Sequence, residues 1–402
     1  MAPMISVGID ISKGKSTVCM VKPYGEVICL PFEMEHTDKG LSELSSMLLK
    51  FNEEVKVVIE ATGIYHLPVL SFLQERELFV AVVNPFEMKQ YRSRGLRSVK
   101  TDKRDSIAIA NYGIDCWFRL KNYEVAESIY QELKILGRQY SHYMRMRIES
   151  VQSLTHLLDY TMPGIKNLLK GWQDSSGKDK LSDFVEVYWH FDNITRLTEE
   201  DFIAGYAAWA KEKGYHQSQN KAVKIYSLAH DGIPTLPAEM ESTQIMIQQS
   251  VNVLKQVNTT LKTILTRMKE LAKKLPEYPV VRAMGGVGDV LAPKLIAEIG
   301  DVRRFHSGKA LIAYAGIDAP PYQSGQFTGT NRKISKRGSS TLRKIGYEVM
   351  RVLKTHSAPE DSSVYYYILK KESEGKSKKL AKIAGLNKFL RIYYARVKEV
   401  YQ

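Results

Sequence analysis

Hydrophobic and polar positions alternate in the first third of the chain as they do in a small α/β domain. Strands are predicted at residues 5–10, 16–21 and 26–30, separated by glycine-containing turns. Helical spacing follows over 41–51 and 64–76, with β-branched, apolar strands at 55–59 and 79–83. Three antiparallel strands followed by helix, strand, helix, strand and helix have the order of a ribonuclease-H-like α/β domain.

Two later segments carry apolar residues at alternating spacings of three and four, which predicts long helices. They cover about 123–160 and 247–275. We expect them to pair as an antiparallel coiled-coil arm or with another subunit, although an ordinary helical core fits the pattern equally well. The residues between them, 161–235, are predicted to form a small helical insertion. Its tryptophans, which we expect in a core rather than stacked on bases, are Trp172, Trp189 and Trp209.

The composition is that of a globular protein with several domains and an anionic partner. The chain has 402 residues and a net charge of +14, which favours nucleic acid. There is no apolar run of transmembrane length and no signal-peptide pattern, so no membrane role is expected. The three cysteines have no ligand or disulfide spacing and fit a reducing cytoplasm; they are Cys19, Cys29 and Cys116.

The segment 100–105 sets two carboxylates in the first turn of a predicted helix, within a basic neighbourhood. Thr101 is a good N-cap, so Asp102 and Asp105 share one face. They repel each other, and either the surrounding lysines and arginines or a divalent metal is expected to hold them together. In a ribonuclease-H-like sheet the first and fourth strands lie side by side, so Asp10 and Glu60 at their ends would join this pair.

Four converging carboxylates suit two Mg²⁺ ions that act on a phosphodiester. Each acid also has an ordinary explanation. Asp10 can begin a turn, and Glu60 can cap the next helix. Asp102 can lie at a helix N-terminus, where the helix dipole stabilises its negative charge.

The region after residue 279 combines a glycine turn, an accessible serine and many basic residues. Residues 284–300 have the form of a helix-hairpin-helix, although the glycines fit a tight helix connection equally well. A helix is predicted over 305–316. Ser324 precedes Gly325, which leaves the serine accessible to a bulky phosphate. Basic residues then dominate 331–354, and the tail over 370–398 is lysine-rich with aromatic residues.

Both ends of the chain resemble the Piv/MooV-type insertion-sequence transposases, which carry a DEDD domain with a RuvC-like fold. The N-terminal motifs are Val7-Gly8-Ile9-Asp10, residues 58–63, Asn84-Pro85 and residues 100–105. The C-terminal motifs are Ala315-Gly316, Ser324-Gly325, residues 334–338 and Leu342-Arg343. The resemblance implies metal binding by Asp10, Glu60, Asp102 and Asp105, and a nucleophilic serine that matches Ser324. Three nearby serines stay open as alternatives: Ser335, Ser339 and Ser340. The resemblance also implies a structured bridge RNA and an assembly of subunits.

The sequence therefore predicts an α/β plus α protein with a RuvC-like domain at 1–118, an arm at 119–278 and a mostly helical serine-bearing domain at 279–402. The expected activity is Mg²⁺-dependent, site-specific DNA recombination through a covalent serine–DNA intermediate, by a homodimer or homotetramer. The residues expected to contact nucleic acid are Arg97, Lys100, Lys103, Arg104, Arg332, Lys333, Lys336, Arg337, Arg343 and Lys344. The alternatives are a metal-dependent nuclease or junction resolvase that uses water, an actin-like kinase, and a non-catalytic nucleic-acid-binding protein.

Overall fold

The computed structural model describes residues 4–62, 64–92, 101–123, 128–169, 179–319, 323–324, 327–328, 333–355 and 363–402. The chain divides into two compact units, Met1–Val125 and Ala126–Gln402. Each unit has its own hydrophobic core. Among the described residues, none of the helices combines the length and apolar character needed to span a membrane.

The first unit is built on a five-stranded sheet with the order β3-β2-β1-β4-β5. Its strands are β1 (Met4–Ile11), β2 (Lys15–Val21), β3 (Val27–Glu35), β4 (Glu54–Glu60) and β5 (Phe79–Val83). Strands β1, β2 and β3 pair antiparallel, whereas β4 and β5 run parallel to β1. The predicted α/β domain, with its first and fourth strands side by side, is confirmed.

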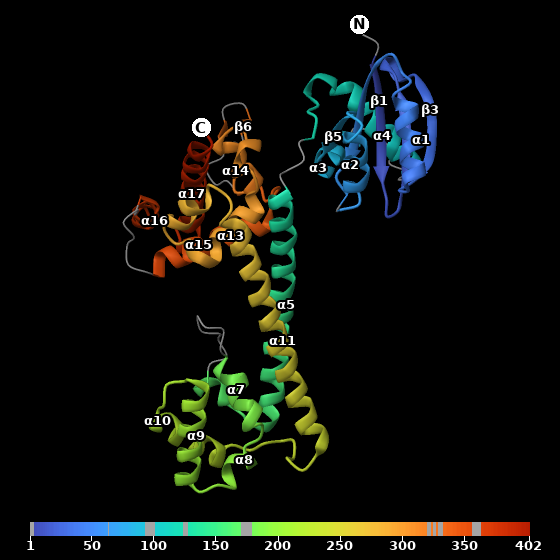
Figure 1. Ribbon diagram of the computed structural model, residues 1–402. Helices are drawn as coiled ribbons and strands as arrows, with labels where there is room; N and C mark the ends of the chain where they lie inside the picture. The colour runs from blue at the N-terminus through green and yellow to red at the C-terminus, as the bar shows by residue number, and fades with distance from the viewer. Residues whose placement is uncertain are drawn as a thin grey trace. The chain divides into compact units, whose positions relative to one another are not determined.

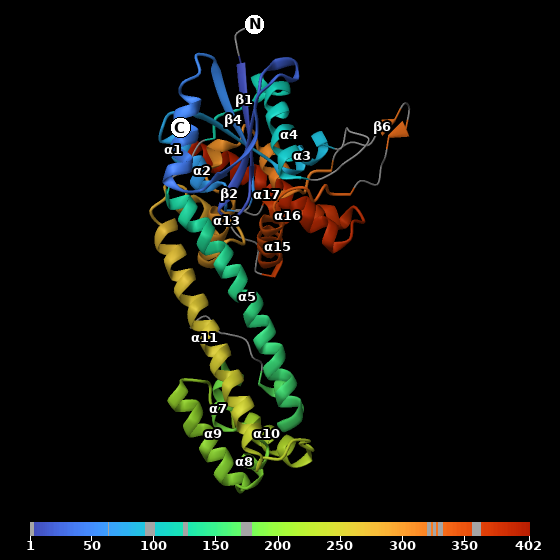
Figure 2. The same ribbon diagram turned by 90° about the vertical axis from the view of Figure 1, so that its right-hand side faces the viewer.

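Helices cover both faces of this sheet (Figures 1 and 2). Helices α1 (Asp38–Leu48) and α2 (Leu67–Gln74) bury their apolar sides on one face. Helix α4 (Asp102–Asp115) packs on the other face, along β1 and β2. A short helix that the sequence did not predict, α3 (Pro85–Arg92), follows β5 and contacts α4. Two short 3-10 turns complete the unit, at Pro23–Gly25 and Trp117–Arg119.

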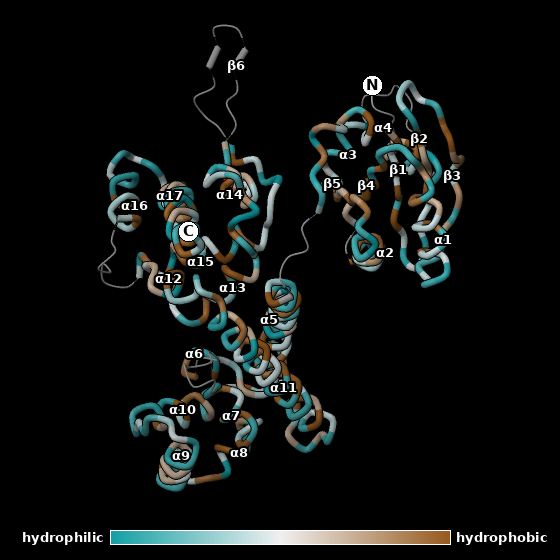
Figure 3. Tube along the Cα trace, turned by 45° about the horizontal axis from the view of Figure 1, so that its top comes forward, coloured by the Kyte–Doolittle hydropathy of each residue, from teal (hydrophilic) through white to brown (hydrophobic). Residues whose placement is uncertain are grey.

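Strand alternation decides which side chains reach α4. Because successive residues of a strand point to opposite faces, Ile5, Val7 and Ile9 of β1 join the core under α1 and α2. Gly8 and Asp10 therefore face α4. Apolar residues run along β1 and β4 (Figure 3), and the polar ends of these two strands interrupt that pattern.

The second unit contains the two predicted long helices, α5 (Ser128–Thr161) and α11 (Glu241–Ala272). They lie side by side and run in opposite directions (Figures 1 and 2). Between them in the chain come α6 (Ile165–Leu168), α7 (Lys180–Val187), α8 (Asp192–Thr195), α9 (Glu199–Lys213) and α10 (Gln219–Asp231). Trp209 is buried in the core of this insertion and Trp189 packs against it, as predicted. Trp172 lies outside the described residues.

The remaining helices share one core with the N-terminal end of α5 and the C-terminal end of α11. They are α12 (Tyr278–Ala283), α13 (Gly288–Ile299), α14 (Gly308–Ala315), α15 (Ser340–Thr355), α16 (Ser363–Ser373) and α17 (Lys378–Val400), with a 3-10 turn at Val302–Arg304. The pair β6 (Gln323–Ser324) and β7 (Phe327–Thr328) lies between α14 and α15 in the chain. The glycine turn before α13 packs on α15, since a Cβ at Gly286 would meet Val349 O at 2.7 Å. This contact favours the tight helix connection over the phosphate-binding hairpin.

Candidate active site

Asp10 and Glu60 come from neighbouring parallel strands and lie at the same edge of the sheet. Ile9 of β1 stands opposite Ile59 of β4 in the register, so Asp10 and Glu60 come next along the two strands. Both side chains are half-buried. Alternation turns both toward the face that α4 covers, as was predicted from the strand order.

Two glycines allow α4 to approach the sheet closely. A Cβ at Gly8 would stand 2.3 Å from both Ala110 N and Ser106 O, and a Cβ at Gly113 would meet Ser6 Oγ at 2.1 Å. Without side chains at these positions the helix backbone rests directly on β1. This close approach brings the first turn of α4 to the end of β1.

The start of α4 is fixed by its predicted cap. Thr101 has extended backbone angles, and its hydroxyl accepts a hydrogen bond from Arg104 N at 3.3 Å. Asp105, one turn from Asp102, is only 8% exposed, whereas Asp102 is exposed. The helix thus contributes one buried and one solvent-facing carboxylate.

Arg92, at the end of α3, lies between two of these acids. Its Nη2 donates to Glu60 Oε2 at 2.6 Å. Its Nε lies 3.2 Å from Asp105 Oδ1, an ion pair without good hydrogen-bond alignment. A basic side chain was expected to hold Asp102 and Asp105 together, whereas Arg92 joins Asp105 to Glu60. Nothing in the residue pattern distinguished Arg92 from its basic neighbours.

Tyrosine contacts between α3 and α4 position this arginine. The rings of Tyr91 and Tyr112 meet edge to face, with centroids 5.3 Å apart. Tyr91 donates to Asp115 Oδ2 at 2.7 Å and Tyr112 donates to Glu87 Oε2 at 3.2 Å. These contacts fix the end of α3 against α4, and Arg92 follows Tyr91 directly.

Asp10 has an electrostatic environment that disfavours its charge. Burial, as the largest cause, and the charges of Asp105, Asp102 and Glu60 together raise the pKa of its carboxyl to about 6, against the lowering effect of Arg92. The charges of all three of the other predicted acids therefore act on the Asp10 carboxyl. A shifted carboxyl among like charges is typical of functional sites.

The donor chemistry of this cluster suits a hard divalent cation. Carboxylate oxygens are the ligands that Mg²⁺ prefers. The charges of the other acids contribute to the raised pKa of Asp10, and an added positive charge would offset this repulsion. As the side chains stand, no group of three or more acidic, histidine or cysteine side chains within the described ranges is arranged to hold a metal. Arg92 supplies the positive charge instead.

Ser324 lies in the second unit, where the backbone of β6 pairs it with Phe327 of β7. Its side chain is outside what the structure describes. Two of the alternative serines have structural partners. Ser335 donates to Asp318, and Ser339 donates to Glu298 while accepting from Leu342 N at 3.0 Å as the cap of α15. Ser340 is exposed.

The predicted nucleic-acid contacts fall into three groups. Arg97, Lys100 and Arg332 lie outside the described residues. Arg343 is half-buried and donates to the carbonyls of Ala315 and Gly338, which is a structural use of its guanidinium. The others are exposed to solvent, namely Lys103, Arg104, Lys333, Lys336, Arg337 and Lys344.

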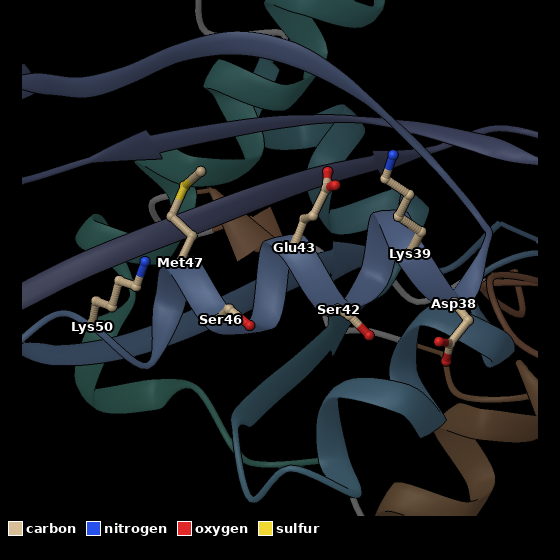
Figure 4. Close-up of a pocket in the computed structure, with 7 residues that line it drawn as sticks. All are labelled: Asp38, Lys39, Ser42, Glu43, Ser46, Met47 and Lys50. Atoms are coloured by element: carbon tan, nitrogen blue, oxygen red, sulfur yellow. The ribbon is translucent and has the colours of Figure 1, made fainter.

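A shallow hollow along α1 is unrelated to this chemistry. Figure 4 shows that its lining comes from α1 and the turn that follows it, between Asp38 and Lys50, with charges of both signs. None of the four clustered acids contributes to it. We therefore assign no function to this hollow.

The comparisons with known proteins agree at both ends of the chain. A family model described as a transposase, of the IS110 DEDD type, matches residues 7–163. A second, described as the transposase IS116/IS110/IS902 family, matches residues 278–366. The chain belongs to this transposase family. The two matches include every predicted acid and the serine of β6.

Relatives of this transposase match along nearly its whole length. A pilin gene-inverting protein of Moraxella bovis is 23% identical over 401 residues, covering 98% of this chain and 95% of that protein. An insertion element IS116 protein of Streptomyces clavuligerus is 21% identical over 375 residues, covering 92% and 89%. A Thermus thermophilus RuvC structure with Holliday junction substrate aligns with 30% of the transposase and 99% of its own chain, at 14% identity and a TM-score of 0.23.

Proposed function

We propose that this transposase is a site-specific DNA recombinase that cuts and rejoins DNA through a covalent serine intermediate. The proposal is supported by one arrangement: Asp10 and Glu60 end neighbouring strands, Arg92 joins Glu60 to Asp105, and burial together with the charges of the other three acids raises the pKa of Asp10. Clustered carboxylates without a catalytic purpose would be costly, because like charges destabilise one another.

The four acids are the proposed holders of Mg²⁺ ions, which would supply charge stabilisation at the scissile phosphate. Arg92 neutralises part of this cluster before the metal binds and has to release Glu60 and Asp105 for it. In the proposed reaction Ser324 Oγ forms a bond to phosphorus while the bond from phosphorus to a deoxyribose oxygen breaks. The serine proton goes to a nearby base or water, and the departing oxygen gains a proton.

The serine ester preserves the phosphodiester's free energy, so that a second hydroxyl can reverse the step and reseal a new partner without ATP. Exposed basic residues on both units would hold DNA by its phosphates. We further propose, from the family resemblance, that a structured RNA chooses the DNA sites and that two or four subunits assemble on them. The domain limits given from the sequence, 1–118, 119–278 and 279–402, are part of this proposal.

The test is a search for a covalent adduct. The protein is purified with its accompanying RNA, mixed with DNA that carries the element's junction and with Mg²⁺, and separated under denaturing conditions. We expect a protein–DNA adduct that is lost in Ser324→Ala and retained in Ser340→Ala, a matched change at an exposed serine. Free DNA ends without any adduct would instead support the rival, a metal-dependent nuclease or junction resolvase that uses water.

A further inference from the structure

A small cavity in the second unit collects lysines from three helices. It has a volume of about 70 Å³ and lies between α5, α13 and α15. Lys134 comes from α5, Lys294 from α13 and Lys344 from α15, and two acids, Glu298 and Glu348, also line the cavity. These helices are far apart in the sequence, so no local motif announces the cluster.

Two of the lysines are held in partly desolvated positions. Lys294 Nζ lies 4.4 Å from the ring centroid of Tyr140. Burial lowers the pKa of Lys294; the charge of Glu348 opposes this shift and the charge of Lys344 adds to it. Burial also lowers the pKa of Lys134, the charges of Arg304 and Arg138 lower it further, and the charge of Glu298 opposes them. Neither Lys134 nor Lys294 forms an ion pair with a carboxylate in the part of the chain that the structure describes.

The acids of the cavity leave its positive charge incompletely balanced. Five cationic groups act in or beside the cavity, against two carboxylates: Lys134, Arg138, Lys294, Arg304 and Lys344. Glu298 is also engaged by the hydroxyl of Ser339. Removing ammonium groups from water is costly unless an anion or good hydrogen-bond acceptors replace the lost hydration. The cavity therefore favours an added anion.

We propose that this cavity binds one phosphate group of a nucleic-acid backbone, through Lys134, Lys294 and Lys344. The proposal rests on the proposed function, which provides the nucleic acid. A contact between these lysines and a backbone phosphate would position nucleic acid without reading its sequence. Such a site gives up some stability in the free protein in exchange for binding.

The experiment measures the salt dependence of binding to a labelled DNA duplex and a labelled RNA hairpin, with the full chain and without divalent metal. We expect Lys294→Met to weaken binding to at least one probe about 5- to 10-fold. We also expect the slope of log K against log salt for that probe to fall by about 1, the loss of one phosphate contact. The free variant should melt no lower than the wild type. Lys274→Met, at an exposed lysine outside the cavity, should change neither quantity.

Unchanged salt slopes for both probes in Lys294→Met and Lys134→Met would overturn the proposal. Stabilisation of the wild type by inorganic phosphate together with those unchanged slopes would identify a free-anion site and would overturn it as well. If Lys294→Met melts at a lower temperature than the wild type, the Lys294→Arg variant tests the proposal instead. It keeps the charge and should restore the slope, and failure to restore it counts against the proposal. The Ser324 adduct is scored separately, so either proposal can fail without the other.

Discussion

Arg92 Nη2 lies 2.6 Å from Glu60 Oε2, and the same guanidinium reaches Asp105. Both ion pairs are largely shielded from solvent, with Arg92 27% exposed and the two acids less than that. A cation that belongs to the protein thus stands where the proposed metal would bind. The proposed metal and the arginine would compete for the same carboxylate oxygens.

Replacing Arg92 with methionine should therefore tighten divalent-metal binding. We expect Arg92→Met to bind Mn²⁺ about tenfold more tightly, ~1.4 kcal/mol, by titration calorimetry. Without metal the variant should lose about 1–3 kcal/mol of stability, because its carboxylates keep their repulsion and lose their counter-charge. Lys89→Met, an exposed change on the same helix, should do neither. Weaker Mn²⁺ binding in Arg92→Met would show that the arginine supports the metal site.

The raised pKa of Asp10 predicts a pH-dependent cost. The folded carboxyl titrates near 6, above its unfolded value of 3.8, so the folded state binds more protons between those values. The stability that the protonated Asp10 carboxyl gives the first unit is therefore lost as pH rises from about 4 to 6.

Asp10→Asn should remove this cost and stabilise the first unit by about 1–2 kcal/mol above pH 6, after allowance for solvent screening. Below pH 4 the gain should vanish. Hydrogen exchange of β1 and α4, measured without metal, reports the change. Glu43→Gln, an exposed acid on α1, is the control. An equal gain at both pH values would rule out the assigned titration.

Gly8 should tolerate no side chain. Alanine would place its Cβ 2.3 Å from two backbone atoms of α4, which have no flexible group to yield. We expect Gly8→Ala to cost ~2–3 kcal/mol or more and to raise hydrogen exchange in α4. It should also abolish activity, because Asp105 would leave Asp10. Gly308→Ala, whose Cβ meets nothing closer than 3.6 Å, should fold normally. A stable Gly8→Ala protein would contradict the close packing of α4 on β1.

A buried carboxylate ties the end of the chain to the start of α5. Glu277 is 1% exposed and accepts hydrogen bonds from Tyr130 at 2.7 Å and from Tyr401 at 2.5 Å. Tyr401→Phe removes one donor and should lower stability by about 1–3 kcal/mol in thermal unfolding. Tyr366→Phe, at a tyrosine that is 59% exposed, should melt like the wild type. Equal melting temperatures for the two variants would show that the hydrogen bond contributes little.

Local signals in the sequence predicted the parts of the site that local chemistry controls. Thr101 caps α4 as expected, because capping depends on a few adjacent residues. The strand order was enough to bring Asp10 beside Glu60, since β1 and β4 are neighbours in this fold. These two inferences rest on local chemistry and strand order alone, and the role of the four acids as metal ligands stays a prediction.

The remaining features depend on tertiary packing and were missed. Helix α3 has a weak apolar pattern, and Arg92 matters only because Tyr91 and Tyr112 hold that helix against α4. Arg343 has the sequence context of a phosphate contact, yet it donates to backbone carbonyls. A basic run does not reveal which of its members face inward. The lysine cavity joins three helices that are far apart in the sequence, so no local motif predicted it, although Lys344 was among the expected nucleic-acid contacts.

The alternation along β1 links folding to chemistry at single-residue resolution. Ile9 packs under α1 and α2, while the adjacent Asp10 meets the acids on the opposite face. Inserting one residue before Gly8 would shift the downstream part of the strand by half a repeat. The isoleucine would then face the acidic cluster, and the aspartate would face the hydrophobic core. Evolution can therefore lengthen the loops around this strand but has almost no freedom to change the number of residues within it.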